Sequence, residues 1–221
     1  EIPHLRSLVV QAAGRLGKEL SKVLPRCASL RELTILDGTF RDLAFLAPCK
    51  LRTLRLVRTS VDKAASLASM AGLRELSLSG MPPGGLGWIR GLADVRVLEL
   101  AERGAVPLQD LDGIRDLGEL RELKLPGHPG NPALDAQVAL LPRLEHTDWP
   151  FSDLTVLAGN TRLRSIGINA ESVKGFSSLA GTAITSVHVS SAASEAQVND
   201  IIKQVEQHVK LSSWGCQASW R

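Results

Sequence analysis

The residues that could do chemistry are few, and the first of them is a glycine–lysine pair near the N-terminus. Gly17 and Lys18 follow an apolar stretch and precede an expected helix, as in a phosphate-binding loop. That loop requires a glycine where Ala12 stands and a Ser or Thr where Glu19 stands. A carboxylate at this position would repel phosphate, so we expect no nucleotide site in this segment.

The histidines and cysteines fall at no spacing that is typical of a metal site. They are His4, His128, His146, His188, His208, Cys27, Cys49 and Cys216. No nucleophile elbow is present, and Asp110 and Asp112 stand in a polar segment where solvated charge is the ordinary explanation. We therefore expect no enzyme activity, no catalytic residue, no cofactor and no metal. Any NTPase activity would belong to a region of the parent protein that precedes residue 1.

Composition indicates one elongated domain, because 221 residues with 44% hydrophobic content can bury a sizeable core. No stretch approaches the roughly 18 apolar residues of a membrane span, and no signal peptide opens the chain. Three cysteines without flanking clusters predict a reducing compartment, and hence a cytoplasmic location. Cys27 and Cys49 are spaced by about one repeat, and we expect a buried pair of free thiols rather than a disulfide.

A six-residue sequence motif, called the phrase below, predicts the strands that position these residues. Its first, fourth and sixth residues are apolar. Nine copies begin at Leu5, Leu30, Leu51, Leu73, Val95, Leu120, Leu144, Leu163 and Ile184. The steps between them run from 19 to 25 residues, a period typical of stacked supersecondary units. Side chains alternate along a strand, so the fourth and sixth residues of each copy face a core and the third and fifth face solvent.

This pattern resembles the leucine-rich repeat family, Leu-x-x-Leu-x-Leu-x-x-Asn/Cys/Thr-x-Leu, over about residues 5–192. The best copy begins at Leu51, with Thr59 at the turn position and Val61 at the next apolar position. Other residues stand at the turn position in six copies, which predicts irregular coils: Gly38, Met81, Arg103, His128, Ser152 and Glu171. The resemblance implies an α/β fold, a right-handed solenoid of about nine coils with a parallel β-sheet on its concave face and short helices and turns on its convex side.

Several return segments are expected to be helical. They are Leu16 to Leu24, Lys63 to Met70 after Asp62, and the segment after Asn131-Pro132, whereas Pro82 to Gly85 is expected to form a turn. After the last copy, Ser194 to Gln197 forms a capping box ahead of an amphipathic helix over 194–211. We expect residues 1–192 to form the solenoid and 193–221 to form a capping helix and a tail, with Trp214, Cys216 and Trp220 packed back on it. A partner-binding helix is the alternative.

The outward strand positions predict where a partner would bind. The third positions are Ser7, Glu32, Thr53, Glu75, Val97, Glu122, His146, Ser165 and Ser186, and the fifth are Val9, Thr34, Arg55, Ser77, Glu99, Lys124, Asp148, Gly167 and His188. These positions carry five acids against two bases. A protein partner that presents Lys or Arg fits this face better than nucleic acid does, despite a net charge of +3.

The second position of the phrase carries a column of arginines: Arg6, Arg31, Arg52, Arg74, Arg96, Arg121 and Arg164. One interpretation is a solvated ladder of salt bridges with Glu32, Glu75 and Glu122. The other is a stripe that binds anions or nucleic acid. The second is weakened because proteins that read single strands use interleaved aromatics, and this chain has no Tyr and four Phe.

The copy that begins at Leu144 departs most from the repeat. Glu145 replaces the arginine, Thr147 replaces an inward leucine, and Trp149 takes the sixth position. A packing compensation explains this, or else His146, Asp148 and Phe151 form a hot spot for a partner. The complete set of candidate partner-binding residues is Arg55, Arg74, Arg96, Glu99, Arg121, Lys124, His146, Asp148, Phe151 and His188.

The sequence therefore predicts a module for protein recognition or ligand sensing. It is similar to the C-terminal sensor repeats of bacterial NLR-like proteins of the NACHT or STAND type, in which an upstream NTPase responds to the ligand. The alternatives are a stand-alone scaffold or adhesion protein, and the substrate-recognition arm of an enzyme whose catalytic domain lies elsewhere. The complete open reading frame would separate the three.

Overall fold

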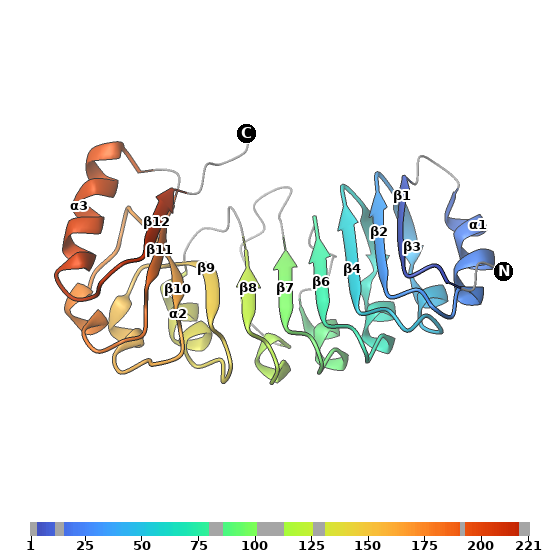
Figure 1. The fold of residues 1–221 in the computed structure, drawn as a ribbon, viewed down its shortest axis with the longest axis horizontal. Helices are drawn as coiled ribbons and strands as arrows, with labels where there is room; N and C mark the ends of the chain where they lie inside the picture. The colour runs from blue at the N-terminus through green and yellow to red at the C-terminus, as the bar shows by residue number, and fades with distance from the viewer. Residues whose placement is uncertain are drawn as a thin grey trace. The chain divides into compact units, whose positions relative to one another are not determined.

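The computed structural model describes residues 4–11, 16–79, 86–100, 113–125, 131–190 and 193–216. The chain forms two compact units, Glu1–Leu120 and Arg121–Arg221, and each is built from coils that contribute one strand and return through a short helix (Figure 1). Some residues discussed above lie outside the described ranges. They are Ala12, the expected turn from Pro82 to Gly85, Met81, Arg103, Asp110, Asp112, His128 and Trp220.

The described residues of the first unit form five parallel strands of the main sheet, in the order β1-β2-β4-β6-β7. Their bounds are β1 Ser7–Gln11, β2 Glu32–Leu36, β4 Thr53–Val57, β6 Glu75–Leu78 and β7 Val97–Leu100, and a separate small sheet pairs β3 Thr39–Asp42 with β5 Ser60–Lys63. The return segments are α1 Leu16–Val23 and the 3-10 helices η1 Leu24–Arg26, η2 Ala44–Leu46, η3 Ala64–Ser69, η4 Gly87–Gly91 and η5 Ile114–Asp116. All five predicted strands of this unit are therefore confirmed.

Five parallel strands, in the order β8-β9-β10-β11-β12, are formed by the part of the second unit that the structure describes. They are β8 Glu122–Lys124, β9 His146–Phe151, β10 Ser165–Ile168, β11 Ser186–Val189 and β12 Ser213–Cys216. The helices are α2 Pro132–Ala139, η6 Leu154–Leu157, η7 Phe176–Leu179 and α3 Glu195–Glu206. Four of these strands were predicted, and β12 was not.

Strand β12 corrects the expectation for the tail. It pairs in parallel with β11, and the side chain of Trp214 is 51% exposed, so this tryptophan does not pack back on the helix. A signal was present in the sequence, because Leu211, Trp214 and Cys216 stand at the first, fourth and sixth positions of a degenerate tenth phrase. The residues that follow Cys216 lie outside the described part of the chain.

The predicted alternation of inward and outward side chains is confirmed in both units. Leu33, Ile35 and Leu54 are 0% exposed, and the inward pair Thr147 and Trp149 is 3% and 0% exposed. One coil cannot bury such a face alone, because its apolar residues need the neighbouring coil above and below. The inward side chains of each strand are therefore buried by the neighbouring coils.

The return segments agree with expectation in two cases and differ in one. Helix α1 forms where predicted, and α2 begins after Asn131, whose side chain accepts a hydrogen bond from the Ala133 amide. The segment after Asp62 is not an α-helix. Asp62 belongs to β5, and η3 is a 3-10 helix in which the Ser66 hydroxyl donates to the Lys63 carbonyl at 2.9 Å. Serine side chains that bond to nearby backbone compete with α-helical geometry.

Helix α3 confirms the predicted capping box, in which Ser194 and Gln197 bond to each other's backbone amides. The helix ends at Glu206 and is therefore shorter than the expected range of 194–211. Its buried face is made by Val198, Ile201, Ile202 and Val205, and it packs next to η7. The division of the chain at residue 192 stays a prediction.

Strand β9 contains an irregularity that displaces everything after His146. His146 pairs with Ser165, but the next pair is Pro150 with Gly167, so three residues of β9 stand opposite the single residue Ile166. The bulged backbone comes very close to β10. A Cβ atom on Gly167 would lie 2.7 Å from the Trp149 carbonyl oxygen, and closer still to the Asp148 carbonyl oxygen. Only glycine fits at this approach.

A buried carboxylate holds the end of β9 to helix α2. Asp135 is 0% exposed, and its Oδ1 accepts a hydrogen bond from the Trp149 indole nitrogen at 2.8 Å. Its Oδ2 accepts from the Ser152 amide at 3.0 Å, the Ser152 hydroxyl at 2.9 Å and the Asp153 amide at 2.9 Å. A buried charge is tolerated when it is hydrogen-bonded in this way. Asp135 was expected to be an ordinary residue of the return side, and nothing in the repeat pattern predicts its burial.

Replacing Gly167 with alanine should destabilise the second unit by about 1–3 kcal/mol, the usual range for overpacking, because the new methyl group would clash with the backbone of β9. Gly215→Ala is the matched control, since its Cβ would meet nothing closer than the His188 Nδ1 atom at 3.8 Å. Urea denaturation followed by circular dichroism measures both. Equal midpoints for the two variants would contradict the close approach at Gly167.

Replacing Asp135 with alanine should cost about 3–5 kcal/mol, because it leaves three buried donors and one partly buried donor without their acceptor. Asp135→Asn should cost less, since one amide oxygen can still accept from Ser152 and Asp153. Asp62→Ala removes an exposed carboxylate and should change stability by about 0.5 kcal/mol or less. If the melting temperature of Asp135→Ala equals that of Asp62→Ala, the carboxylate does not anchor β9.

Candidate binding surface

The side chains at the third and fifth strand positions form a surface that we call the open face. In the first unit, the third positions align in register as Ser7, Glu32, Thr53, Glu75 and Val97, and the fifth as Val9, Thr34, Arg55, Ser77 and Glu99. This face carries three acids and one base. Arg55 bonds to Glu75 at 3.5 Å, and both side chains remain more than 40% exposed. Glu32 and Glu99 make no ion pair within the described residues.

The open face of the second unit is polar with little net charge. Its third-position row runs from exposed His146 through Ser165 and Ser186 to Ser213, and the Ser213 hydroxyl donates to the Ser186 hydroxyl at 3.0 Å. On β8, Lys124 bonds to Glu122 at 2.7 Å. Asp148 is half-buried and accepts a hydrogen bond from the Leu125 amide, while His188 is half-buried at the fifth position. Hydroxyl and imidazole groups dominate this surface.

The expected hot spot around β9 is not assembled. Phe151 is 0% exposed, because the bulge in β9 brings it into register with the inward residue Ile168. The prediction that Phe151 contacts a partner is therefore wrong. Of the three proposed members, His146 alone is exposed, and Asp148 accepts a hydrogen bond from the amide of Leu125, the residue that follows β8. The packing interpretation of this coil is confirmed by the burial of Thr147 and Trp149.

The arginine column follows from the hydrogen bonds that stack the coils. The Arg52 amide donates to the Arg31 carbonyl at 2.7 Å, the Arg74 amide to the Arg52 carbonyl at 2.8 Å, and the Arg96 amide to the Arg74 carbonyl at 2.8 Å. Each of these coils therefore has an arginine immediately before its strand, next to the arginine of the neighbouring coil. In the first unit Arg6, Arg52, Arg74 and Arg96 are exposed, and Arg31 is half-buried.

The expected ladder of salt bridges with Glu32, Glu75 and Glu122 does not form. Within the described part of the chain, Arg52, Arg74 and Arg96 make no side-chain hydrogen bond or ion pair. Residues at the second and third positions point to opposite sides of a strand, which keeps each glutamate away from the arginine before it. Arg31 instead donates to the carbonyls of Ala28 at 2.9 Å and Leu30 at 2.8 Å.

One arginine of the column is neutralised, in the second unit. Arg121 bonds to Glu145 at 3.2 Å, and Glu145 occupies the second position of the next coil. Members of one column lie on the same side of the sheet, which brings Glu145 to Arg121. In the described part of the first unit the column contains no carboxylate, and its arginines make no ion pair.

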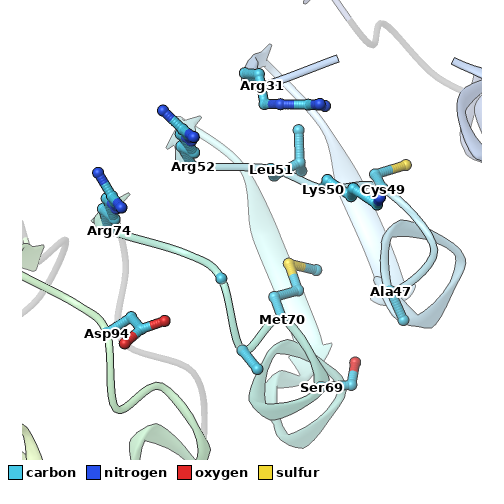
Figure 2. Close-up of a pocket in the computed structure, with 12 residues that line it drawn as sticks. Arg31, Ala47, Cys49, Lys50, Leu51, Arg52, Ser69, Met70, Arg74 and Asp94 are labelled. Atoms are coloured by element: carbon cyan, nitrogen blue, oxygen red, sulfur yellow. The ribbon is translucent and has the colours of Figure 1, made fainter. Parts of the chain in front are cut away.

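A hollow of about 500 Å³ lies beside this run of arginines (Figure 2). Figure 2 shows Arg31, Arg52 and Arg74 at the start of three successive strands, with Asp94 beyond Arg74. With Lys50, the lining contains four cations and one carboxylate. Cys49, Leu51 and Met70 also line the hollow, but their side chains are buried. The accessible side chains therefore give the hollow a positive charge.

The expected pair of buried free thiols is confirmed. Cys27 and Cys49 are free, 7% and 6% exposed, and their sulfur atoms lie 3.6 Å from the Val23 carbonyl and 3.4 Å from the Leu24 carbonyl. Burial raises the pKa of the Cys49 thiol above its ordinary value, and the neighbouring Cys27 raises it further. Such a thiol stays protonated and unreactive. The side chain of Cys216 lies outside the described residues.

Two further observations concern the described residues only. They contain no group of three or more His, Cys, Asp and Glu side chains that could hold a metal ion. They also contain no helix that is long and apolar enough to cross a membrane.

Comparison with solved structures identifies the fold of this chain. No protein-family model matches the chain, and no curated protein matches it significantly. Among solved structures, an internalin (inlF) from Listeria monocytogenes str. 4b F2365 is 18% identical with a TM-score of 0.64, and the match covers 95% of this chain and 60% of that chain. Internalin C2 (inlC2) from the same strain is 19% identical with a TM-score of 0.59, covering 75% of this chain and 74% of that chain.

Internalins are leucine-rich repeat proteins, and this likeness confirms the fold that the sequence pattern predicts. The chain spans about 60% of the length of the inlF internalin. At such low identity, the similarity supports a shared fold but not a shared function or binding site. The chain has the leucine-rich repeat fold.

Proposed function

We propose that this chain is a protein-recognition module that binds its partner through the open face of its sheet. The observation that carries the proposal is the register of the strands, which arranges outward side chains in straight rows on a rigid backbone. Repeat proteins with this architecture use such surfaces for binding. Most of these outward groups are polar and at least partly exposed, so they are free to contact a partner.

The charge on the first unit's open face favours a basic partner. Glu32 and Glu99 have no ion pair within the described residues, and Arg55 neutralises Glu75 alone. Lys and Arg side chains of a partner would pair with the two remaining carboxylates. Complementary charge of this kind accelerates association and selects among partners.

We further propose that the array is the ligand-recognition part of a larger bacterial NLR-like protein of the NACHT or STAND type, and that it works in the cytoplasm. The similarity of the repeats to such sensor regions supports the first point, and the two buried free thiols support the second. A phosphate-binding motif upstream in the complete open reading frame is the expected result. A signal peptide there would contradict both points.

Changing Glu32 and Glu99 together to serine should weaken binding of a basic partner about tenfold, because two unpaired carboxylates are removed from the open face. Peptides selected from a displayed random library on the wild-type chain provide the probes. We expect them to be enriched in Lys and Arg. Biolayer interferometry then gives the affinity of each selected peptide for the variant.

The matched control changes two acids away from the open face, Asp62 in β5 and Glu171 after β10, to serine. Both are exposed and carry the same charge as the open-face pair. This control should bind the selected peptides as the wild type does, and both variants should keep the wild-type melting temperature. If the control loses binding and the open-face variant does not, the return side is the interface.

A further inference from the structure

We propose that the hollow at the start of β4 and β6 is a second binding site, which takes an acidic peptide segment of a partner protein. This inference goes beyond the open face, because it concerns a different surface and a ligand of the opposite charge. The hollow lies entirely within the first unit. Its principal anchors are Arg52, Arg74 and Lys50.

The four cations that line the hollow outnumber its one carboxylate, Asp94. Arg52, Arg74 and Lys50 make no side-chain hydrogen bond or ion pair within the described residues, and Asp94 makes none either. Adjacent strands are about 4.8 Å apart, so the ladder of backbone bonds forces the two arginines to begin close together. Like charges held this close repel each other, and a bound anion between them would remove the repulsion.

The shape of the hollow depends on a glycine. Lys50, Gly72 and Asp94 each stand immediately before the first residue of a repeat phrase, so they occupy one column over three coils. Gly72 is the middle member and has no side chain to fill the space between Lys50 and Asp94. The volume of about 500 Å³ lies within the range of roughly 300–1,000 Å³ that is common for ligand sites.

The chemistry of the lining favours carboxylates on a peptide. Guanidinium groups present paired donors that match a carboxylate in a bidentate arrangement. Leu51 and Met70 also line the hollow but are buried, so the exposed side chains of Arg52, Arg74 and Lys50 supply most of the contact to a ligand. Single-stranded nucleic acid would require aromatic side chains on which its bases stack, and the lining contains none. An acidic peptide segment is therefore the ligand that fits.

The test measures the fluorescence anisotropy of a fluorescein-labelled peptide, Glu-Glu-Leu-Glu-Glu, against the whole chain. We expect saturable binding that weakens as salt is added. The Lys-Lys-Leu-Lys-Lys peptide should not compete for this site. A labelled oligothymidylate distinguishes the alternative class of ligand, and tighter binding of it at the same residues would overturn the assignment to a peptide.

Two variants address charge and shape separately. Changing Arg52 and Arg74 together to glutamine should weaken the acidic peptide about tenfold. Gly72→Leu leaves the net charge unchanged and should weaken it by a similar factor, because the new side chain occupies the hollow. The site tolerates a side chain at its base, since a Cβ on Gly72 would meet only the Leu51 carbonyl oxygen, at 3.9 Å.

The matched control removes two other exposed arginines of the first unit, Arg26 and Arg41, by changing them to glutamine. It should bind the acidic peptide within about twofold of the wild type. Equal loss in the control and in the hollow variants would show non-specific attraction and overturn the proposal, as would an absence of saturable binding. If Gly72→Leu fails to fold, the two arginine pairs decide alone.

The serine variant of Glu32 and Glu99 should bind the acidic peptide as well as the wild type does. This result separates the two surfaces, because loss of the open face then leaves the hollow intact. Loss of acidic-peptide binding in that variant would show that the peptide occupies the open face, and would overturn the assignment to the hollow.

Discussion

The backbone ladder between successive coils determines the rest of this structure. Amide groups at the second and third positions of one coil donate to the carbonyl at the second position of the coil before it, as Arg52 and Thr53 do to Arg31 at 2.7 and 3.0 Å. These bonds fix the register of each pair of strands, and with it the column in which each side chain stands. Every coil buries its apolar residues against its neighbours, so the ladder and the core form together.

Fixed columns decide which charges can meet. Arg121 is neutralised by Glu145 because both belong to the second column of adjacent coils, and Arg55 meets Glu75 because both lie on the open face. The arginines of the first unit have only arginines beside them in their column, and the acids of the next position face the other way. The fixed register therefore places acidic side chains on the open face and arginines in the second column, although the two kinds of residue stand next to each other in the sequence.

Sequence periodicity predicted nine strands, the inward residues and the capping box, because each depends on residues close together in the chain. It missed β12, whose phrase at Leu211 is degenerate. It also placed Phe151 on the surface, because a bulge that sets three residues against Ile166 depends on how two coils fit together. The salt-bridge ladder failed for a related reason: proximity in the sequence between Arg74 and Glu75 does not bring their side chains to one side of the strand.

The turns that follow the strands obtain their hydrogen bonds in two different ways, as the irregular coil around Trp149 shows. In a regular coil, the single proton of the Thr59 hydroxyl is shared between the carbonyl oxygens of Ile35 at 3.1 Å and Val57 at 3.0 Å. The same hydroxyl accepts from the Gly38 amide at 3.3 Å, which links its turn to the preceding coil. Ser152 stands at the same repeat position, but its amide and hydroxyl donate to Asp135 on the return helix α2 instead. The carboxylate also accepts from the Trp149 indole, so the large inward side chain and the turn share one acceptor. A buried acid thereby replaces the side chain that the repeat usually supplies at its turn.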